Sequence, residues 1–328
     1  MKQYSTKPKD KTETVLRDKT DTIAVLAADL HFSHKPPLAR STEPDWYQAQ
    51  INYIRQLRQL SLSAPVIVAG DIFDRWNAPA ELINMLLKEL PQIYAVAGNH
   101  DLANHDYSQL HRTAYGTLVE AGKIINLEPE KPVDVAGWYP FRLHGFPYGF
   151  PYGFPISSLE KGNGLVTEIA VLHAYVWTDK SGGYPGAPED QKGAAIKEKG
   201  KGFDVILTGD NHSQVSMTTK PPLLYNPGGF LRRRMDERDF APRVGLLKVR
   251  ESGELHIESH YLDVSSDVFT DEDTAETLKQ EGMEDLLQEL NDLTDTAIDF
   301  ESRLRQVMES MSVPILVKRA ITNALEGK

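Results

Sequence analysis

Five apolar segments of this chain each end at a short group of potential metal ligands, and this pattern constrains the fold more than any other feature. The segments have the length and composition of buried strands and cover residues 22–28, 66–69, 93–97, 169–172 and 205–208. The groups that follow them are Asp29-Leu30-His31, Gly70-Asp71-Ile72-Phe73-Asp74, Gly98-Asn99-His100-Asp101, His173 and Gly209-Asp210-Asn211-His212. Because open α/β sheets bind ligands at the carboxyl ends of their strands, we expect the five groups to meet at one site.

The order of the remaining segments predicts an α/β fold. Helix-like segments at residues 45–60 and 78–90 alternate with the first strands, which is typical of βαβ units, and Asn77 is a candidate N-cap of the second helix. After residue 130 the pattern changes to short β segments, at residues 133–138, 142–146, 168–173, 215–218, 243–249 and 254–261. We therefore expect a second, mixed sheet that packs on the first.

An unusual tandem repeat of Phe-Pro-Tyr-Gly occupies residues 145–155. Its prolines are incompatible with a central strand or a helix, so we expect a loop. The aromatic rings of this loop either pack on one another or stack on nucleic-acid bases.

The charge of the chain is distributed unevenly. The formal net charge is −11, but residues 270–328 contribute −8 of it, so residues 1–269 are nearly neutral. Since binding to phosphate backbones depends on Lys and Arg, the candidate contacts are Arg232-Arg233-Arg234 and the basic N-terminal arm at residues 1–21. The alternative is that both are solvated surface.

The absence of cysteine narrows the chemistry that this chain can perform. It excludes disulfides, thiolate zinc sites and cysteine nucleophiles, and it fits a reducing cytoplasm. The first 21 residues are polar and charged, unlike a signal peptide, and no apolar segment approaches the roughly 20 residues that span a bilayer. We therefore expect a cytoplasmic protein that does not enter a membrane.

The ligand types indicate a pair of divalent ions. Such a pair needs a carboxylate that bridges the ions, and Asp71 is the natural bridge. The other ligands divide between the two ions, with Asp29, His31 and His212 for one and Asn99, His173 and Asp210 for the other. A water molecule between the ions would lose a proton near neutral pH and attack a phosphorus atom.

Further residues near these ligands are predicted to assist the reaction. His100 is not needed as a ligand and is expected to protonate the leaving oxygen, while Asp74 accepts a hydrogen bond from its ring and fixes its tautomer. Asp101 is expected to accept hydrogen bonds near the site. The candidates for substrate binding are His34, Arg40, Arg232 and Arg233, although solvent exposure is the alternative for the first two.

These motifs resemble those of the calcineurin-like metallophosphoesterase superfamily, whose pattern is D-x-H, G-D-x-x-D, G-N-H-D/E, H and G-H-x-H. The resemblance covers about residues 22–262 and implies a four-layer sandwich of two mixed sheets flanked by helices. Within the superfamily, the stretches GDIFDRWNAP and YAVAGNHDLANH and residues 225–233 are most similar to DNA-repair exonucleases. These are the nuclease subunits of SbcCD-type complexes, including phage-encoded members, which act in the host cytoplasm.

Asp210 departs from the family pattern, because it stands where the family has the first His of G-H-x-H. A carboxylate can still bind a metal ion, and as a hard oxygen donor it favours Mn²⁺, which we expect here, or Mg²⁺. It also adds a third negative charge to the site, which predicts weaker or more metal-selective catalysis. Alternatively, Asp210 does not bind and the second metal site is incomplete.

The acidic segment at residues 270–328 predicts a helical hairpin. Apolar residues recur at steps of three and four between Met283 and Met311, and Pro314 opens a shorter helix that ends near Leu325. This apolar stripe packs either on its own domain or on a partner. The resemblance implies a coiled-coil ATPase of the SbcC type as the partner of residues 283–325, and a homodimer formed through nuclease-domain helices.

The leading prediction for function is a metal-dependent phosphodiesterase that hydrolyses DNA, as an exonuclease in repair or recombination. Two alternatives stay open. The same core serves phosphatases and small-nucleotide phosphodiesterases. A scaffold subunit with weak catalysis is the other alternative, although a scaffold would have no need of the full ligand set.

Overall fold

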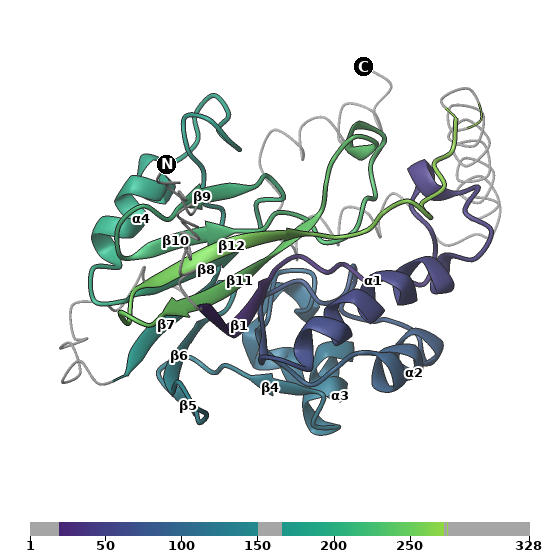
Figure 1. Ribbon diagram of the computed structural model, residues 1–328. Helices are drawn as coiled ribbons and strands as arrows, with labels where there is room; N and C mark the ends of the chain where they lie inside the picture. The colour runs from purple at the N-terminus through teal and green to yellow at the C-terminus, as the bar shows by residue number, and fades with distance from the viewer. Residues whose placement is uncertain (1–19, 150–165, 272–273, 275–328) are drawn as a thin grey trace, which may run out of the picture. The chain divides into compact units, whose positions relative to one another are not determined.

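The computed structural model describes residues 20–149, 166–271 and 274 (Figure 1). The chain divides into two compact units, residues 1–269 and 270–328. The described helices and strands belong to the first unit. The predicted hairpin at residues 283–325 and the first 19 residues of the predicted basic arm lie outside the described residues.

Among the described residues, two six-stranded mixed sheets form the centre of the first unit. The first has the order β12-β11-β1-β2-β3-β4 and the second the order β5-β6-β7-β8-β10-β9. The strands of the first sheet are β1 (Thr20–Ala27), β2 (Val66–Ala69), β3 (Ile93–Val96), β4 (Ile124–Asn126), β11 (Arg243–Arg250) and β12 (Leu255–Tyr261). Those of the second sheet are β5 (Val133–Val135), β6 (Phe141–Phe146), β7 (Thr167–His173), β8 (Val205–Gly209), β9 (Val215–Met217) and β10 (Leu223–Asn226).

Each sheet contains a parallel block, and the ligand motifs follow strands of these two blocks. Strands β1 to β4 run parallel to one another, as do β6, β7, β8 and β10. Antiparallel strands complete the sheets: β11 and β12 beside β1, β5 beside β6, and β9 beside β10. Since parallel strands end at the same edge of a sheet, each block gathers its motifs at one edge.

The helices complete a four-layer sandwich, as the sequence predicts. Helices α1 (Trp46–Ser61), α2 (Ala80–Glu89) and α3 (Ala114–Glu120) lie on the first sheet, and α4 (Gly193–Lys199) lies on the opposite side of the molecule against the second (Figure 1). Short 3₁₀ helices occupy Leu38–Arg40, Ala103–His105, Tyr107–Arg112, Glu189–Gln191 and Met235–Glu237.

The alternation of side chains in the strands explains these layers. In β2, Val66 and Val68 pack with the helices, whereas Ile67 and Ala69 pack against the second sheet. A strand covered on both faces must be apolar at every position, and all four residues of β2 are buried.

Three details differ from the sequence-based predictions. Strands β11 and β12 join the first sheet through β1, not the second, because an alternating pattern identifies a buried face but not the neighbouring strand. Helix α2 has Pro79 as its N-cap instead of Asn77. Gly145 and Phe146, which belong both to the predicted β segment at residues 142–146 and to the predicted loop at residues 145–155, are the last residues of β6, so the β segment is confirmed and the loop starts later. No helix in the described part of the chain is long and apolar enough to cross a membrane.

Candidate metal centre

Asp71 lies at the centre of the site that the strand ends form. It follows β2, and its Oδ2 atom is 3.5 Å from His31 Nε2 on one side and 3.5 Å from His173 Nε2 on the other. His31 follows β1 in the first sheet, and His173 is the last residue of β7 in the second. A carboxylate between imidazoles from both sheets has the placement that a bridging ligand needs.

The first cluster of donors contains Asp29, His31 and His212 together with Asp71. The Nε2 atoms of the two histidines are 2.9 Å apart. One ligand atom from each of Asp29, His31 and His212 lies within 4.8 Å of the others. Asp29 Oδ2 is buried and has no hydrogen-bond partner among the described residues, as expected for an atom that faces a cation.

The second cluster surrounds His173 Nε2. This atom is 2.9 Å from Asn99 Oδ1 and 3.8 Å from Asp210 Oδ1. The other ring nitrogen, Nδ1, donates a hydrogen bond to the carbonyl oxygen of Ala69 at 2.8 Å. This bond keeps a proton on Nδ1, so that Nε2 is the nitrogen that binds a cation once it has lost its own proton, and it is the usual outer support of a ligating histidine.

All seven predicted ligands, Asp210 included, thus come together, although their binding of metal ions stays a prediction. The donor set fits a pair of divalent ions, because carboxylate, amide oxygen and imidazole are the ligands that such ions prefer in proteins. Asp29, His31, Asp71 and His173 are buried, whereas Asn99, Asp210 and His212 are half-buried and His100 is exposed. The centre is therefore deep on one side and open to substrate on the other.

The carboxylates give the site a strong attraction for positive charge. Burial by itself lowers the pKa of His173, but Asp71, Asp29 and Asp210 offset this and raise its pKa to about 9. His212 is different, because its burial outweighs the attraction of Asp71 and, with the help of Arg233, lowers its pKa to about 4. At neutral pH, His212 is a neutral ligand and His173 carries a proton that a cation must displace.

Strained backbone at the strand ends positions the ligands. Four ligands have backbone φ angles in the left-handed region, which residues other than glycine rarely adopt. The angles are 50° for Asp29, 46° for His31, 51° for Asp71 and 75° for Asp210. Such strain persists only where the surrounding structure enforces it, and it concentrates at functional sites.

The glycines of the motifs are needed because ligands pack directly on them. A Cβ atom at Gly98 would lie 2.0 Å from Asp71 Oδ1, and one at Gly70 would lie 2.1 Å from His173 Nδ1. Both distances are far shorter than van der Waals contact.

Asp101 supports the centre from behind, as the sequence predicts. It is fully buried and accepts backbone N–H bonds from Phe73 and Gly98 at 2.9 Å and from Ile72 at 3.2 Å. These bonds join the motif that carries Asp71 to the motif that carries Asn99.

Asp74 accepts a hydrogen bond from the ring of His100, as the sequence predicts, but with its main chain and not with its carboxylate. His100 Nδ1 donates its hydrogen bond to the backbone carbonyl oxygen of Asp74, at 2.7 Å. The carboxylate of Asp74 pairs instead with Arg233, whose Nη2 is 2.5 Å from Oδ1. The ring of His100 is still fixed by residue 74, but through its main chain.

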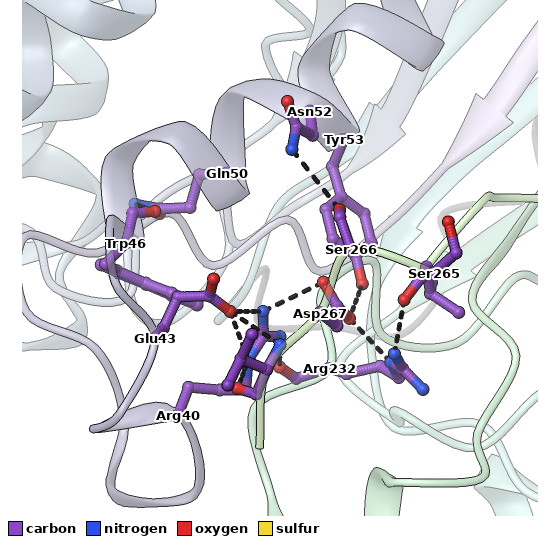
Figure 2. Close-up of polar contacts among 12 residues, drawn as sticks. Arg40, Glu43, Trp46, Gln50, Asn52, Tyr53, Arg232, Ser265, Ser266 and Asp267 are labelled. Atoms are coloured by element: carbon purple, nitrogen blue, oxygen red, sulfur yellow. Dashed lines mark hydrogen bonds and ion pairs between the residues drawn. The ribbon is translucent and has the colours of Figure 1, made fainter. Parts of the chain in front are cut away.

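Two of the four predicted substrate contacts, Arg40 and Arg232, have structural roles. Arg40 is 1% exposed and binds Glu43, Asp267 and the carbonyl oxygen of Arg232 (Figure 2). Arg232 is 8% exposed and pairs with Asp267 at 2.8 Å. Both guanidinium groups already have partners inside the protein, so the prediction of substrate contact is wrong for them.

The other two, His34 and Arg233, line a cavity of about 510 Å³ beside the centre, whose lining includes Asp74, 4.0 Å from the ring of His31, but none of the seven predicted ligands. A second cavity, of about 230 Å³, reaches the centre at His173 and Asp210. Sequence reasoning missed other residues that line these cavities, namely Lys35 and Arg75 in the first and Tyr175 in the second. The sequence indicates a role for these residues only by their position, since each lies within four residues of a predicted site residue.

The sequence pattern of calcineurin-like phosphoesterases matches residues 24–214, which is more than half of the 328-residue chain. This chain is a calcineurin-like phosphoesterase. The family and the clustered ligands make it a metal-dependent phosphoesterase. A comparison of this phosphoesterase with curated proteins finds no match.

Among solved structures, the phosphoesterase is similar to a putative 5′-nucleotidase from Staphylococcus aureus, with 14% identity, a TM-score of 0.49 and coverage of 80% of this chain and 58% of that one. It is also similar to the NAD nucleotidase of Haemophilus influenzae, with 15% identity, a TM-score of 0.44 and coverage of 80% of this chain and 56% of that one. A third similar structure is the 5′-nucleotidase precursor of Thermus thermophilus, with 12% identity, a TM-score of 0.44 and coverage of 82% of this chain and 59% of that one. The chain spans less than two thirds of each of these proteins, so their activities are not assigned to it.

Replacement of Gly98 by alanine is expected to abolish metal binding, because the new methyl group displaces the carboxylate of Asp71. Isothermal titration of purified Gly98→Ala protein with Mn²⁺ measures this. The matched control is Gly137→Ala, where a Cβ meets nothing within 4 Å. Equal affinity of the wild type and the Gly98→Ala protein for Mn²⁺ would contradict the bridging role of Asp71.

Metal binding is also expected to release protons at neutral pH. The reason is the raised pKa of His173, which is about 9. Below that pH the ring must lose a proton before Nε2 can bind a cation, so metal affinity rises with pH up to about 9. Titrations at pH 7 in buffers of different ionisation enthalpy count the protons, and at least one per chain is expected. Release of none would show that His173 is neutral in the metal-free protein or is not a ligand.

Proposed function

We propose that this phosphoesterase hydrolyses phosphodiester bonds of DNA. The observation that carries the proposal is the presence of a cavity on each of two sides of the metal centre. The larger borders the centre through Asp74, which lies 4.0 Å from the ring of His31, and the smaller is lined by the ligands His173 and Asp210. A phosphate bound between them has room for an organic group on both sides, which a diester needs and a monoester does not.

The linings of the two cavities differ in a way that suits a nucleic acid. The smaller cavity is lined by the aromatic side chains of Phe146, Tyr148 and Tyr175. The ring of Tyr148 lies 6.2 Å from that of His173, so an aromatic surface adjoins the centre. Aromatic side chains of this kind stack with bases and tolerate any sequence. The larger cavity is lined by His34, Lys35, Arg75 and Arg233, which favour phosphate.

The chemistry divides between the metal ions and His100. Ions held by the seven ligands would supply a nucleophile from water at neutral pH and would neutralise the charge of the phosphate. His100 Nδ1 donates to the carbonyl oxygen of Asp74, so Nε2 is the ring nitrogen left to carry the proton that the leaving oxygen receives. Arg233 pairs with Asp74, which lies 4.0 Å from the ring of His31, and thereby ties the loop beside His100 to the centre.

The metal that we propose is Mn²⁺, with Mg²⁺ as the second choice. Asp210 adds a hard oxygen donor at the position where the family has an imidazole. Its side chain is 26% exposed, and its backbone N–H donates to Asp29 Oδ1 at 2.9 Å, which holds the residue against the first cluster. We further propose an exonuclease that acts with a coiled-coil ATPase bound at residues 283–325 and forms a homodimer.

Substitution of His100 by asparagine is expected to lower kcat on linear DNA by about a hundredfold or more, because the leaving oxygen loses its proton donor. The assay digests single- and double-stranded DNA with Mn²⁺, with Mg²⁺ and with a chelator. His111→Asn is the matched control, since His111 is an exposed histidine on the 3₁₀ helix Tyr107–Arg112, and its kcat should equal that of the wild type.

The same assay separates the alternatives. Hydrolysis of p-nitrophenyl phosphate without hydrolysis of its bis-ester or of DNA would identify a phosphatase and overturn the proposal. Cleavage of none of these substrates, alone or with the ATPase, would identify a scaffold.

Exchange of Asp210 for histidine is expected to shift metal preference from Mn²⁺ and Mg²⁺ towards Zn²⁺, because imidazole replaces a hard oxygen donor and removes one negative charge. Isothermal titration with each metal gives the order of affinities. The variant Asp210→Asn keeps an oxygen donor without the charge, so it separates the effect of donor type from that of charge. An unchanged order in Asp210→His would show that residue 210 does not bind the metal.

A further inference from the structure

The larger cavity beside the metal centre has a charge opposite to that of the protein. The chain has a net charge of −11, yet the charged residues that line this cavity are Lys35, Arg75 and Arg233 against Asp74 alone. Because Asp74 is already paired with Arg233, two positive charges stay in excess. An anion is the ligand that such a lining favours.

Lys35 and Arg75 are the residues that can provide this binding. Both side chains are exposed, and neither forms an ion pair within residues 20–149 and 166–271. His34, in contrast, is engaged with its own neighbours, since its Nδ1 atom is 2.9 Å from the hydroxyl of Tyr47 and 3.8 Å from Glu81. Arg233 can assist, because its buried Nε has no hydrogen-bond partner among the described residues.

The position of the cavity identifies which part of a substrate it would hold. It contains Asp74, whose backbone carbonyl oxygen holds His100, so it adjoins the side on which the leaving group receives its proton. The leaving side of a polynucleotide carries the phosphate of the next nucleotide. The volume of about 510 Å³ is ample for a nucleotide unit.

We infer that this cavity is a binding subsite for a second phosphate group of the substrate, on the leaving-group side, with Arg75 and Lys35 as its contacts. The inference rests on the proposed function, in that it assigns the second phosphate to a neighbouring nucleotide. The enzyme then distinguishes a polynucleotide from an isolated diester by this additional phosphate, and the aromatic cavity receives the part of the substrate on the other side of the reacting bond.

Binding of small nucleotides tests the subsite without cleavage of DNA. The probes are thymidine 3′,5′-bisphosphate and the two thymidine monophosphates, titrated calorimetrically into Mn²⁺-loaded His100→Asn protein. The bisphosphate is expected to bind about tenfold more tightly than either monophosphate, which is the effect of one charge-assisted contact. Adding Arg75→Ala or Lys35→Ala should reduce this preference to about a third or less.

The matched control is Arg55→Ala, an exposed arginine on α1 that lies outside the cavity lining. It removes the same charge from the protein, so it should leave the preference for the bisphosphate intact. Equal affinity for the bisphosphate and the monophosphates would overturn the subsite, and so would an equal loss of preference in Arg55→Ala and Arg75→Ala.

The subsite and the proposed function can fail separately. If the wild type cleaves no DNA but prefers the bisphosphate in a manner that depends on Arg75, the proposed function is wrong and the subsite stands. If the wild type cleaves DNA and shows no such preference, the subsite is wrong and the proposed function stands.

Discussion

The repulsion among Asp29, Asp71 and Asp210 sets the condition that the rest of the site must meet. Burial weakens the screening of these charges, so the protein has to compensate each of them. For Asp29 and Asp71 it does so with main-chain donors: the N–H of Asp210 binds Asp29 Oδ1 at 2.9 Å, and the N–H of His100 binds Asp71 Oδ1 at 3.0 Å. In both residues Oδ1 is used for positioning, and Oδ2 is left for the centre. Asp29 and Asp71 thus each support the fold with one oxygen and offer the other to a cation.

Those main-chain donors are available only because the backbone turns sharply after each strand. The segments that follow β1 and β2 continue to pair beyond the ends of the strands, through Asp29 N–H to the Gly70 carbonyl at 3.1 Å and His31 N–H to the Asp71 carbonyl at 2.9 Å. This pairing holds three ligands in the left-handed conformation that they would not adopt alone. The glycines before Asp71 and Asn99 provide the space into which neighbouring ligands pack.

The sequence predicts this part of the protein well, because local pattern and chemistry agree there. The predicted bounds of β2 match the structure, and the seven ligands meet as the strand-end pattern requires. Other features depend on contacts that no local pattern encodes. The antiparallel pairing of β11 with β1 joins segments more than two hundred residues apart. The link between His100 and Asp74 uses a main-chain atom, whereas sequence reasoning weighs side chains.

The roles of Arg40 and Arg232 also depend on a contact between distant parts of the chain, which the local sequence does not reveal. Their partner Asp267 lies more than thirty residues from either, and it accepts hydrogen bonds from both arginines and from Tyr53 of α1 (Figure 2). Removal of one member of such a buried network typically costs about 3–5 kcal/mol, because its partners stay buried without compensation. The network therefore anchors the chain at Arg232. Arg233 comes next along the chain, and its side chain turns to Asp74 and the larger cavity instead. A buried arginine thus fixes the position from which its neighbour reaches the site.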